Sequence, residues 1–504
     1  MQRTTGPDRT GAHAAIDGGA AVAGEAARQD GGCGRPAVVI GGSMAGLLAA
    51  RVLADHFERV TVVERDRFPA EPAFRKGVPQ ARHVHVLLTR GSRALERLFP
   101  GVTAELAAAG APAVDWTADL AVLMRGGWHP RFPSGMVTRT CSRALLEWTI
   151  RRRVAARSNI RFLEACDVVD LLPDPSGAGV AGARLRWREA PPERLAPEER
   201  EALRADLVVD ASGRDSRAPR WLGALGYPAP AETTINSFLG YATRWYRRPA
   251  GFAADWKALL LSAGPPEGKR GGVILPVEGD RWFVTLTGGG RDYPPADEAD
   301  FLAFARTLRA PTLYEAILGA EPLSPVYSYR RTENRLRHYE RLPRWPEGFV
   351  VVGDAVCAFN PVYGQGMTVA ALAAEALDAC LAAQTARGGL AGLAPRFQRQ
   401  LAKVNEPAWL LATGEDFRYR ETEGGRPGWT ARLLHRYMDH LLLAAAQDPA
   451  VHRVFIEVIQ LLQPPRALAR PSIALAVLRH AARRWLALAG RGAPLAVRYR
   501  ADGA

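Results

Sequence analysis

The stretch that decides the fold is residues 38–64, VVIGGSMAGLLAARVLADHFERVTVVE. Its apolar start, 38–40, predicts a buried parallel strand, and Gly41 lets the chain turn sharply into a helix. Gly46 lets that helix pack closely on the strand, and Glu64 closes a second strand 23 residues after Gly41. This order predicts a dinucleotide-binding unit, in which the helix N-terminus faces a pyrophosphate.

The glycine turn departs from the usual GxGxxG fingerprint at one position. Ser43 occupies the middle glycine position, where the backbone approaches a phosphate most closely. Its hydroxyl either crowds the turn or donates a hydrogen bond to the phosphate. Glu64 stands where an acidic side chain meets the ribose hydroxyls of an adenosine. An ordinary turn rich in small residues is the alternative, but the full context favours nucleotide binding.

Length and composition are typical of a large enzyme. The 504 residues suffice for two or three lobes, and 47% of them are hydrophobic, which provides an ample core. The chain carries 66 Lys and Arg against 52 Asp and Glu, a net charge of +14. Such a balance favours anionic partners. The arginines are scattered and no nucleic-acid-binding motif is present, so we expect a solvated basic surface and no nucleic acid.

Cysteine usage and the N-terminal residues bear on the cellular compartment. Five cysteines are an odd number, widely spaced and without a CxxC pair, which predicts a reduced, cytoplasmic protein. Residues 1–36 are rich in Gly, Ala and Arg, lack the apolar core of a signal peptide and are expected to form a disordered tail. No run reaches the roughly 18 uninterrupted apolar residues that a spanning helix needs.

Polar residues crowd the loop after the first unit, in FRKGVPQARHVHVLL at 74–88. Arg75 belongs to this group, and its place just beyond a nucleotide site suggests contact with the cofactor. His83 and His85 alternate onto one side of an extended segment, but no third ligand is near, so we predict no metal site. Ordinary loop or strand histidines are the first interpretation, and proximity to the cofactor is another.

A second helix is expected to begin at Ser142, a good N-cap residue, in CSRALLEWTIRRRVA at 141–155. Arg143 then falls in the first turn, where a cation is unfavourable. An anionic ligand would explain its position, and a surface arginine is the alternative.

Two later segments share one layout. Strands are predicted at 207–210 and 350–352, each followed by an acidic or small-residue turn. In the second, Asp354 precedes a loop with Gly364 and Gly366, and then a long Ala/Leu helix. A carboxylate at a strand end suits polyol hydroxyls, and the helix dipole suits an electron-rich ring edge. Both strand ends are expected to meet the first unit around one extended cofactor.

These three motifs in this order resemble the class A flavoprotein monooxygenases of the para-hydroxybenzoate hydroxylase fold. The glycine turn with its acidic residue is similar to the FAD adenosine site, DASGRDS at 210–216 to the DGxxS motif, and GD at 353–354 with PVYGQG at 361–366 to the GD motif. Ser212 stands in place of the usual Asp. Within the class, RKGVPQARHVHVL, CSRALLEWT, DLVVDASGR and GDAVCAFNPVYGQGM closely resemble actinobacterial polyether epoxidases of the squalene-epoxidase-like group, over residues 36–385.

The resemblance implies bound FAD and a role for each matching position. Glu64 and Arg65 would contact the adenosine ribose region, Arg75 and Arg143 the phosphates or ribityl chain, and Val168 the adenine. Asp354 would bind a ribityl oxygen, and Met367 would offer its backbone N–H to the flavin pyrimidine edge. The full cofactor-binding set is Gly41, Gly42, Ser43, Met44, Ala45, Gly46, Glu64, Arg65, Arg75, Arg143, Val168, Asp354, Gly364, Gly366 and Met367.

The expected fold class is α/β, with a Rossmann-type FAD-binding βαβ domain, a mixed β-sheet substrate domain and a helical C-terminal region. After the tail, the boundaries are 37–232 and 331–385 for the two parts of the FAD domain, 233–330 for the substrate sheet and 386–504 for the helical region. The sheet would roof the substrate pocket over the flavin. The helical region is a structural cap or, as in squalene epoxidases, an element that dips into a bilayer.

The activity implied is monooxygenation. A flavin C4a-hydroperoxide would pass one O2-derived oxygen to a hydrophobic polyene, polyketide or terpenoid by epoxidation or hydroxylation, in secondary metabolism, so no catalytic residue is named. Electrons would come from NAD(P)H or a separate reductase. A reductase or cyclase of the geranylgeranyl-reductase or lycopene-cyclase type, and a flavoprotein without turnover, are alternatives; a halogenase is disfavoured because WxWxIP is absent. The protein is expected in the cytoplasm, with peripheral membrane contact as an alternative.

Overall fold

The structure is a computed structural model that describes residues 35–188, 201–385 and 389–489. Most of the predicted tail, including Cys33, lies outside the described residues. The predicted boundary at residue 36 is wrong by one position, because the first strand begins at Pro36 and pairs with Arg59.

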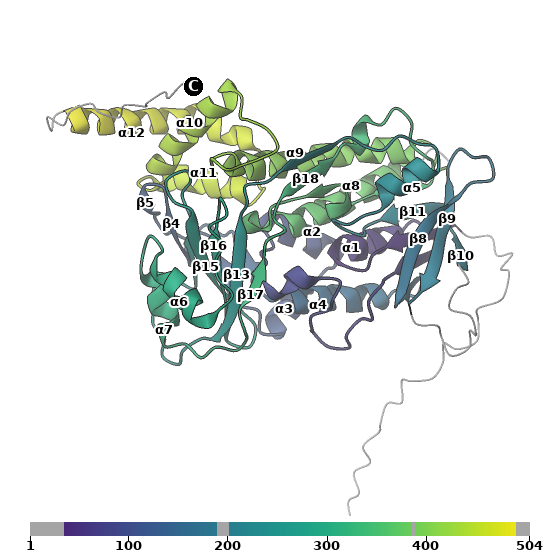
Figure 1. The fold of residues 1–504 in the computed structure, drawn as a ribbon, viewed down its shortest axis with the longest axis horizontal. Coiled ribbons are helices and arrows are strands. Elements are labelled where there is room, and N and C mark those ends of the chain that lie inside the picture. The colour runs from purple at the N-terminus through teal and green to yellow at the C-terminus, as the bar shows by residue number, and fades with distance from the viewer. Residues whose placement is uncertain (1–34, 189–200, 386–388, 490–504) are drawn as a thin grey trace, which may run out of the picture. The chain divides into compact units, whose positions relative to one another are not determined.

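The first sheet contains five parallel strands in the order β19-β11-β1-β2-β7, of which β11 is labelled in Figure 1. Their bounds are β1 Pro36–Ile40, β2 Arg59–Val63, β7 Ile160–Leu163, β11 Leu207–Asp210 and β19 Phe349–Val351. The runs VVI, LVV and FVV are apolar without alternation and TVV is buried throughout, as expected for a parallel sheet covered on both faces. Helix α1, Met44–Leu53, connects β1 to β2 and confirms the predicted βαβ unit.

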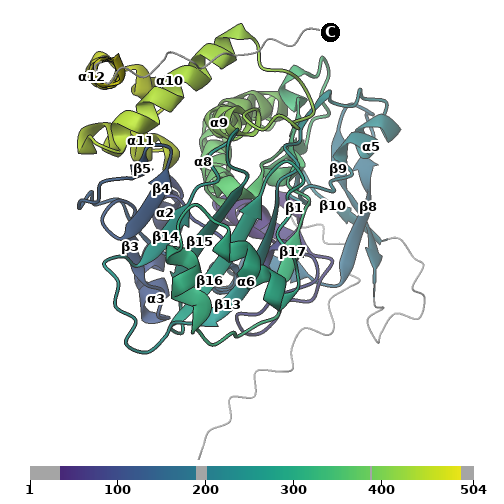
Figure 2. The same cartoon turned by 60° about the vertical axis from the view of Figure 1, so that its left-hand side comes forward.

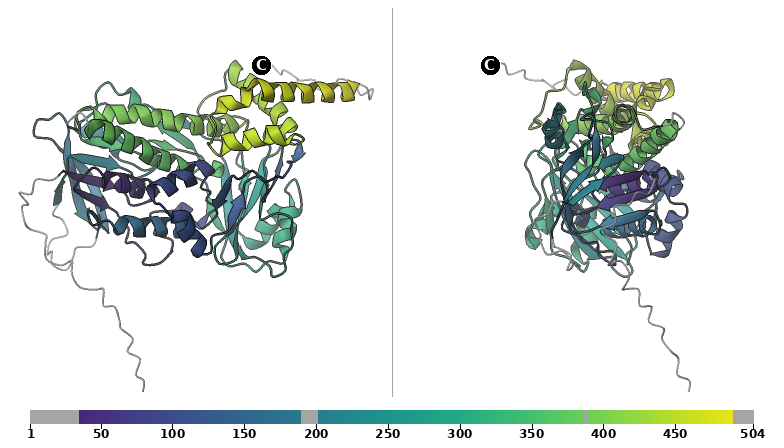
Figure 3. Two further views of the ribbon diagram at one scale, coloured as in Figure 1. Left: turned by 180° about the vertical axis from the view of Figure 1, so that it is seen from behind. Right: turned by 90° about the vertical axis from the view of Figure 1, so that its right-hand side faces the viewer.

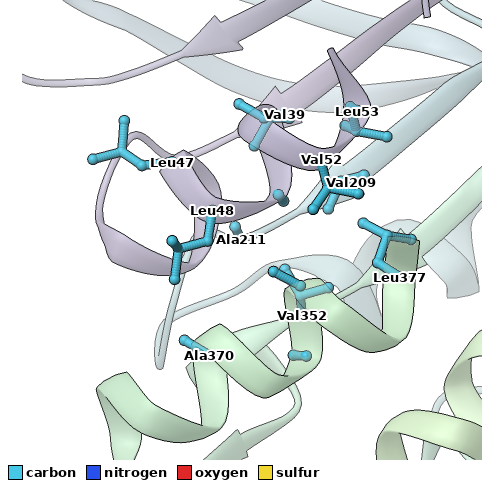
Figure 4. Close-up of a cluster of buried hydrophobic side chains, with 14 of the residues drawn as sticks. Val39, Leu47, Leu48, Val52, Leu53, Val209, Ala211, Val352, Ala370 and Leu377 are labelled. Atoms are coloured by element: carbon cyan, nitrogen blue, oxygen red, sulfur yellow. The ribbon is translucent and has the colours of Figure 1, made fainter. Parts of the chain in front are cut away.

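Helices pack on this sheet and on one another. They are α2 Thr89–Leu98, α3 Val102–Ala108, α4 Arg143–Ala155, α8 Gly366–Thr385 and α9 Leu393–Asp416. Helix α8 contacts α1, α2 and α9, and the left view of Figure 3 shows α1, α8 and α9 running alongside one another. In Figure 4, Leu48 and Val52 of α1 face Ala370 and Leu377 of α8 across buried strand residues.

Helix α8 is also the one described helix long and apolar enough to cross a membrane, over Gly366–Gln384 with a mean hydropathy of 1.5. Within this window, 61% is buried inside the protein. Its composition therefore reflects its place in the core between α1 and α9.

The second sheet contains seven strands in the order β17-β13-β16-β15-β14-β4-β5. Their bounds are β4 Leu120–Met124, β5 Gly127–Trp128, β13 Gly240–Arg247, β14 Ala258–Leu261, β15 Arg270–Val277, β16 Arg281–Gly288 and β17 Tyr327–Tyr329. Helices α6, Glu298–Arg306, and α7, Thr312–Leu318, cover one face of it (Figure 2). The sheet is mixed, because β14 pairs with β4 in parallel and with β15 in antiparallel orientation.

This sheet corrects the sequence-based assignment of one segment. Strands β4 and β5 fall inside 37–232, which was assigned to the FAD domain, yet they form the edge of the sheet assigned to 233–330. The pairing of β4 with β14 joins residues 138 positions apart, such as Leu120 and Ala258, and local periodicity contains no signal for it. Helices α6 and α7 were also not anticipated among the strand-like runs.

Smaller elements complete the structure. Three antiparallel strands, β8 Cys166–Pro173, β9 Val180–Trp187 and β10 Glu201–Arg204, form one sheet, and β12 Glu232–Ile235, β18 Asn334–Arg337 and β20 Cys357–Ala358 form another. Strands β3 Ala113–Asp115 and β6 Val137–Arg139 pair with each other, and α5 spans Ala218–Ala224. Short 3₁₀ helices lie at Pro79–Arg82, Tyr339–Arg341, Gly353–Ala355, Pro361–Tyr363 and Pro465–Ala469.

The C-terminal helices divide between two cores. Helix α9 belongs to the core of the first sheet, where Phe397 and Leu401 are fully buried. Helices α10 Trp429–Ala445, α11 Pro449–Ile459 and α12 Pro471–Ala489 instead pack with residues of β4, β14 and β15. With these helices, the parallel sheet and the mixed sheet, the structure confirms the predicted fold class.

Candidate functional site

The glycine turn after β1 is built for close approach. Gly41 has a φ of +97°, and a Cβ there would lie 2.7 Å from the carbonyl oxygen of Ala211 in the loop after β11. A Cβ on Gly46 would lie 1.8 Å from the carbonyl oxygen of Gly41. Only glycine fits at either position, for the reasons of turn geometry and helix packing predicted from the sequence.

The third motif meets the first turn of α1. Gly353 has a φ of +63°, and a Cβ there would lie 2.7 Å from the Cβ of Ala45. Backbone hydrogen bonds tie the strand ends together, since Ala211 donates to Ile40 and Val352 donates to Asp210, both at 2.9 Å. The structure therefore brings all three motifs to one edge of the parallel sheet.

Glu64, the acidic residue at the end of β2, is buried against the turn. Its Oε2 accepts a hydrogen bond from the amide of Gly42 at 2.8 Å, and its Oε1 accepts one from the amide of Asp66 at 3.0 Å. Arg75 lies 3.1 Å from the same Oε1. The carboxylate is thus fixed beside the glycine turn.

Two buried arginines and three carboxylates form a cluster at the N-terminus of α1. Arg75 contacts Glu64 and Asp66 at 3.1 Å and Glu147 at 3.0 Å. Arg143 lies 2.7 Å from Glu147 and donates to the hydroxyl of Ser43, also at 2.7 Å. This arginine–carboxylate cluster connects the glycine turn with the loop at 74–88 and with α4.

The charges in the cluster hold one another ionised. Burial raises the pKa of Glu147, but Arg143 and Arg75 outweigh it, and the net pKa lies below its usual value. Burial lowers the pKa of Arg75, but Glu147 and Glu64 reverse the effect and raise it. Buried charges require such pairing, because an unpaired one pays a large desolvation cost.

Ser43 and Arg143 contact each other in the structure. The hydroxyl of Ser43 does not cap α1; it donates to Glu147 at 2.9 Å and accepts from Arg143. Arg143 is the first residue of α4, whose N-cap Ser142 accepts from Leu145 as predicted. It is buried, so the surface alternative is wrong, and Glu147 of its own helix supplies an anion beside it.

The second motif closes a loop on itself. Asp210 is fully buried and accepts from the amide of Ser212 at 2.9 Å and from the hydroxyl of Ser216 at 2.5 Å. Arg214 donates to Glu333 at 2.9 Å and to the carbonyl of Phe359 at 3.1 Å. The motif thereby anchors Arg214 to Phe359, which lies between the two parts of the third motif.

Asp354 stands apart from these networks. No hydrogen bond from a described residue reaches it, and burial raises its pKa, while Arg214 and Arg143 act in the opposite direction. At Gly366, the first residue of α8, the nearest atom to an added Cβ is an oxygen of Asp354, 4.0 Å away. A carboxylate that accepts no hydrogen bond from the described residues therefore lies beside the N-terminus of α8, which continues into Met367.

The second sheet presents a face of aromatic and hydroxyl side chains near this point. On β13, Tyr241 stacks with Tyr329 at 5.4 Å, and Trp245 stacks with Phe283 at 4.8 Å. Burial raises the pKa of Tyr329; Arg214 lowers it and Asp354 raises it further, so this face is within electrostatic reach of both. The aromatic face and Asp354 thus border the same part of the molecule.

His83 and His85, two positions apart, have separate partners. Nδ1 of His83 lies 2.9 Å from the hydroxyl of Thr243, and Nδ1 of His85 lies 3.0 Å from the carbonyl of His83. Burial lowers the pKa of His83 to about 3 and that of His85 to about 4, so both are neutral near pH 7. Within the described ranges, no three His, Cys, Asp or Glu side chains gather as metal ligands.

Two hollows adjoin the site. One, with about 300 Å³ of empty space, is lined by residues that include Arg75, Arg143, Glu147 and Trp148. The other, with about 500 Å³ including open solvent, is lined by residues that include His85, Cys141 and Met367. The first belongs to the arginine–carboxylate cluster, and the second reaches the N-terminus of α8.

Two predicted residues lie at the margin. Arg65 is exposed, and its guanidinium lies 3.4 Å from the carbonyl of Gly77. Val168 is buried on β8 among core residues. Sequence reasoning missed Glu147 and Arg214 as site residues. Glu147 could have been found from its spacing, because a position four residues after Arg143 allows an ion pair on one helix face. Arg214 lies inside the quoted second motif.

Comparison with known proteins shows the family to which the chain belongs. Protein Rv3254 of Mycobacterium tuberculosis (strain ATCC 25618 / H37Rv) is 35% identical over 459 residues, which covers 89% of this chain and 94% of that protein. The chain belongs to the Rv3254 family. No protein-family model matches this member of the Rv3254 family.

Solved structures show the fold of this Rv3254-family chain. The flavin-dependent brominase Bmp2 has a TM-score of 0.62 at 17% identity, with 90% of this chain and 99% of that chain covered. A flavoprotein/dehydrogenase from Cytophaga hutchinsonii gives 0.61 at 16%, covering 88% and 96%. PqsL, a probable FAD-dependent monooxygenase from Pseudomonas aeruginosa, gives 0.54 at 17%, covering 84% and 99%. The Rv3254-family chain therefore has a class A flavin monooxygenase-like fold.

Proposed function

We propose that the protein binds FAD and uses it as a monooxygenase. The observation that carries the proposal is the meeting of the three motifs at one sheet edge, where no described residue donates a hydrogen bond to Asp354. A ribityl hydroxyl would supply the hydrogen bond that Asp354 lacks. The fold shared with proteins described as flavin-dependent supports the choice of cofactor.

The residues present fit the dinucleotide half of FAD as well. A pyrophosphate would lie at the N-terminus of α1, where Ser43 makes no capping bond and the first-turn amides carry positive partial charge. Glu64 would accept from ribose hydroxyls, and Arg143 and Arg75 would compensate the phosphate charge. Gly353 and Gly366 leave room where a side chain would intrude.

Reduced FAD, when bound, would activate O2 so that one oxygen atom passes to the substrate, while the other takes two electrons from the flavin and two protons and leaves as water. The protein's part is to bind, orient and exclude water. The aromatic face with Tyr241, Tyr329 and Trp245 would hold an apolar substrate, and buried His83 would stay neutral there. No acid–base pair is required, which agrees with the uncharged aromatic and hydroxyl side chains of this face.

The test is product analysis under ¹⁸O2 with candidate polyenes, polyketides and aromatics. One labelled oxygen in an epoxide or alcohol supports monooxygenation and separates the two outcomes. Turnover that continues without oxygen indicates a reductase or cyclase instead. A halogenated product formed only with added halide would contradict the proposal, and supplying NAD(P)H with and without a flavin reductase identifies the electron source.

We also propose that the hydrophobic substrate is collected at an anionic membrane surface through α12. Ile473 and Val477 of this helix are buried against the second core. Leu475, Leu478 (65% exposed), Trp485 (64% exposed) and Leu486 lie on the opposite side, within an arc of about 100° at 100° per residue. An apolar stripe on the outward side is not what a solvated structural cap needs.

Charge favours an anionic bilayer over a second copy of the chain. Helix α12 contains three arginines and no acidic residue, and Arg479 and Arg483 lie along one edge of the stripe. Each arginine near an anionic bilayer contributes about 1 kcal/mol. A second copy would instead bring these arginines together.

Vesicle flotation tests this contact. The full chain should float with vesicles of phosphatidylcholine and phosphatidylglycerol, and less with phosphatidylcholine alone. The double variant L478E/W485E should stay in solution, while L318E, which changes an exposed leucine on α7, should behave as wild type. Equal flotation of the double variant and wild type, or a dimer that L478E/W485E dissociates, would overturn the proposal.

A further inference from the structure

The end of α9 carries a buried carboxylate that touches the loop of the third motif. Asp416 is fully buried, and its Oδ1 accepts a hydrogen bond from the hydroxyl of Tyr363 at 2.7 Å. Its Oδ2 accepts one from the amide of Asn334 at 2.6 Å. The amide of Asn360 reaches both oxygens, at 3.2 and 3.3 Å.

The three donors define the path of the loop. Asn360 caps the 3₁₀ helix Pro361–Tyr363 by accepting from Val362, and its own amide N–H donates to Asn334 at 2.7 Å. Tyr363 precedes Gly364, which has a φ of +66° and leads into α8. Asp416 therefore holds the segment that sets the N-terminus of α8 beside Asp354.

We propose that Asp416 is a positioning residue, whose ionised carboxylate holds the loop at 360–366 in the shape that retains FAD. This inference rests on the proposed function. The ionised form accepts from every neighbouring donor, whereas the protonated form loses one acceptor position and leaves Tyr363 or an asparagine amide without its partner. The loop would then loosen on protonation, and FAD would be released more readily.

The environment of the Asp416 carboxylate shifts its protonation toward neutral pH. Burial raises the pKa of Asp416 to about 6, against the effect of its hydrogen bonds. The neighbouring titratable groups are Tyr363 on the loop, and Glu415 and Tyr419 next to Asp416 in the chain. Burial also raises the pKa values of Glu415 and Tyr419, and Arg418 faces Glu415. In the described residues, no arginine or lysine pairs with Asp416 itself.

The experiment measures FAD released from purified holoenzyme after dilution into buffers spanning pH 5 to 8, by flavin fluorescence. Wild type should retain FAD above pH 6 and release it below, with affinity falling by at most about tenfold per pH unit because one proton is linked. Asp416→Asn should release FAD at every pH and show no inflection. Tyr363→Phe keeps the carboxylate but removes a donor, so its inflection should move to higher pH.

Glu406→Gln, at an exposed carboxylate on the same helix, is the matched control and should follow wild type. An inflection that is unchanged in both Asp416→Asn and Tyr363→Phe would overturn the inference. If Asp416→Asn does not fold, as judged by its melting curve, the shift in Tyr363→Phe decides. A wild-type protein that holds no FAD at any pH would instead overturn the proposed function.

Discussion

Gln460 at the end of α11 is bonded twice to Thr89 at the start of α2. Its side-chain carbonyl accepts from the amide of Thr89 at 2.7 Å and from the hydroxyl at 2.9 Å. Both residues are buried. The C-terminal helices are thus fastened to the helix that follows the loop at 74–88, in addition to packing on the second sheet.

Gln460→Ala should therefore destabilise the whole chain. It leaves two buried donors of Thr89 unsatisfied, at a cost of about 1–3 kcal/mol for each unpaired group. Urea unfolding followed by tryptophan fluorescence measures the change. Gln463→Ala, which removes a bond to exposed Arg470, should change stability by less than about 0.5 kcal/mol; equal losses in the two variants would contradict the role assigned to Gln460.

Ser43→Ala should weaken the protein before any cofactor is considered. The variant removes the hydroxyl that lies between Arg143 and Glu147, at a cost of about 1–2 kcal/mol. The melting temperature of the FAD-free protein is the measurement. A variant as stable as wild type, but with weaker FAD binding, would mean that the hydroxyl serves the phosphate instead.

Glu147→Gln should be more severe, because it leaves Arg75 and Arg143 without their shared carboxylate. Breaking a buried pair costs about 3–5 kcal/mol. The folded pKa of Glu147 is lowered from 4.5, so its contribution is present above pH 4.5 and is lost as the pH falls through the folded pKa. Unfolding free energies at pH 7 and pH 4 should therefore differ more in wild type than in the variant.

Asp354→Asn should separate cofactor binding from stability. No hydrogen bond from a described residue reaches Asp354, and burial of its charge opposes folding, so the FAD-free variant should be as stable as wild type or more so. It should nevertheless lose most of its FAD, as measured by the ratio of flavin to protein absorbance. Full FAD occupancy would remove Asp354 from the proposed site.

Local sequence predicted the elements that local forces determine. The apolar run before Gly41 and the cap at Ser142 each depend on a few neighbouring residues, and the structure confirms the strand and the helix. The need for glycine in the motifs could also be predicted from the sequence, because that need is steric. These features gave the fold class and the edge of the sheet where the motifs meet.

Contacts between residues far apart in the chain could not be predicted from the sequence in the same way. The pairing of β4 with β14 and the reach of Asp416 to Tyr363 join residues far apart in the sequence, and no periodicity marks them. Ser43 illustrates the limit well. Its position in the turn was evident, but its partners on α4 could be identified only once that helix was placed beside the turn.

The strand order of the first sheet has a consequence for biosynthesis. Strand β1 lies between β2 and β11, and β11 in turn needs β19, which ends at Val351. The loop at 360–366, which completes the site, also needs its hydrogen bond to Asp416. On the ribosome, β1 can pair with β2 early, but its other edge must remain unpaired or shielded until β11 has emerged, and β11 must in turn wait for β19, which makes this a protein whose yield should depend on chaperones.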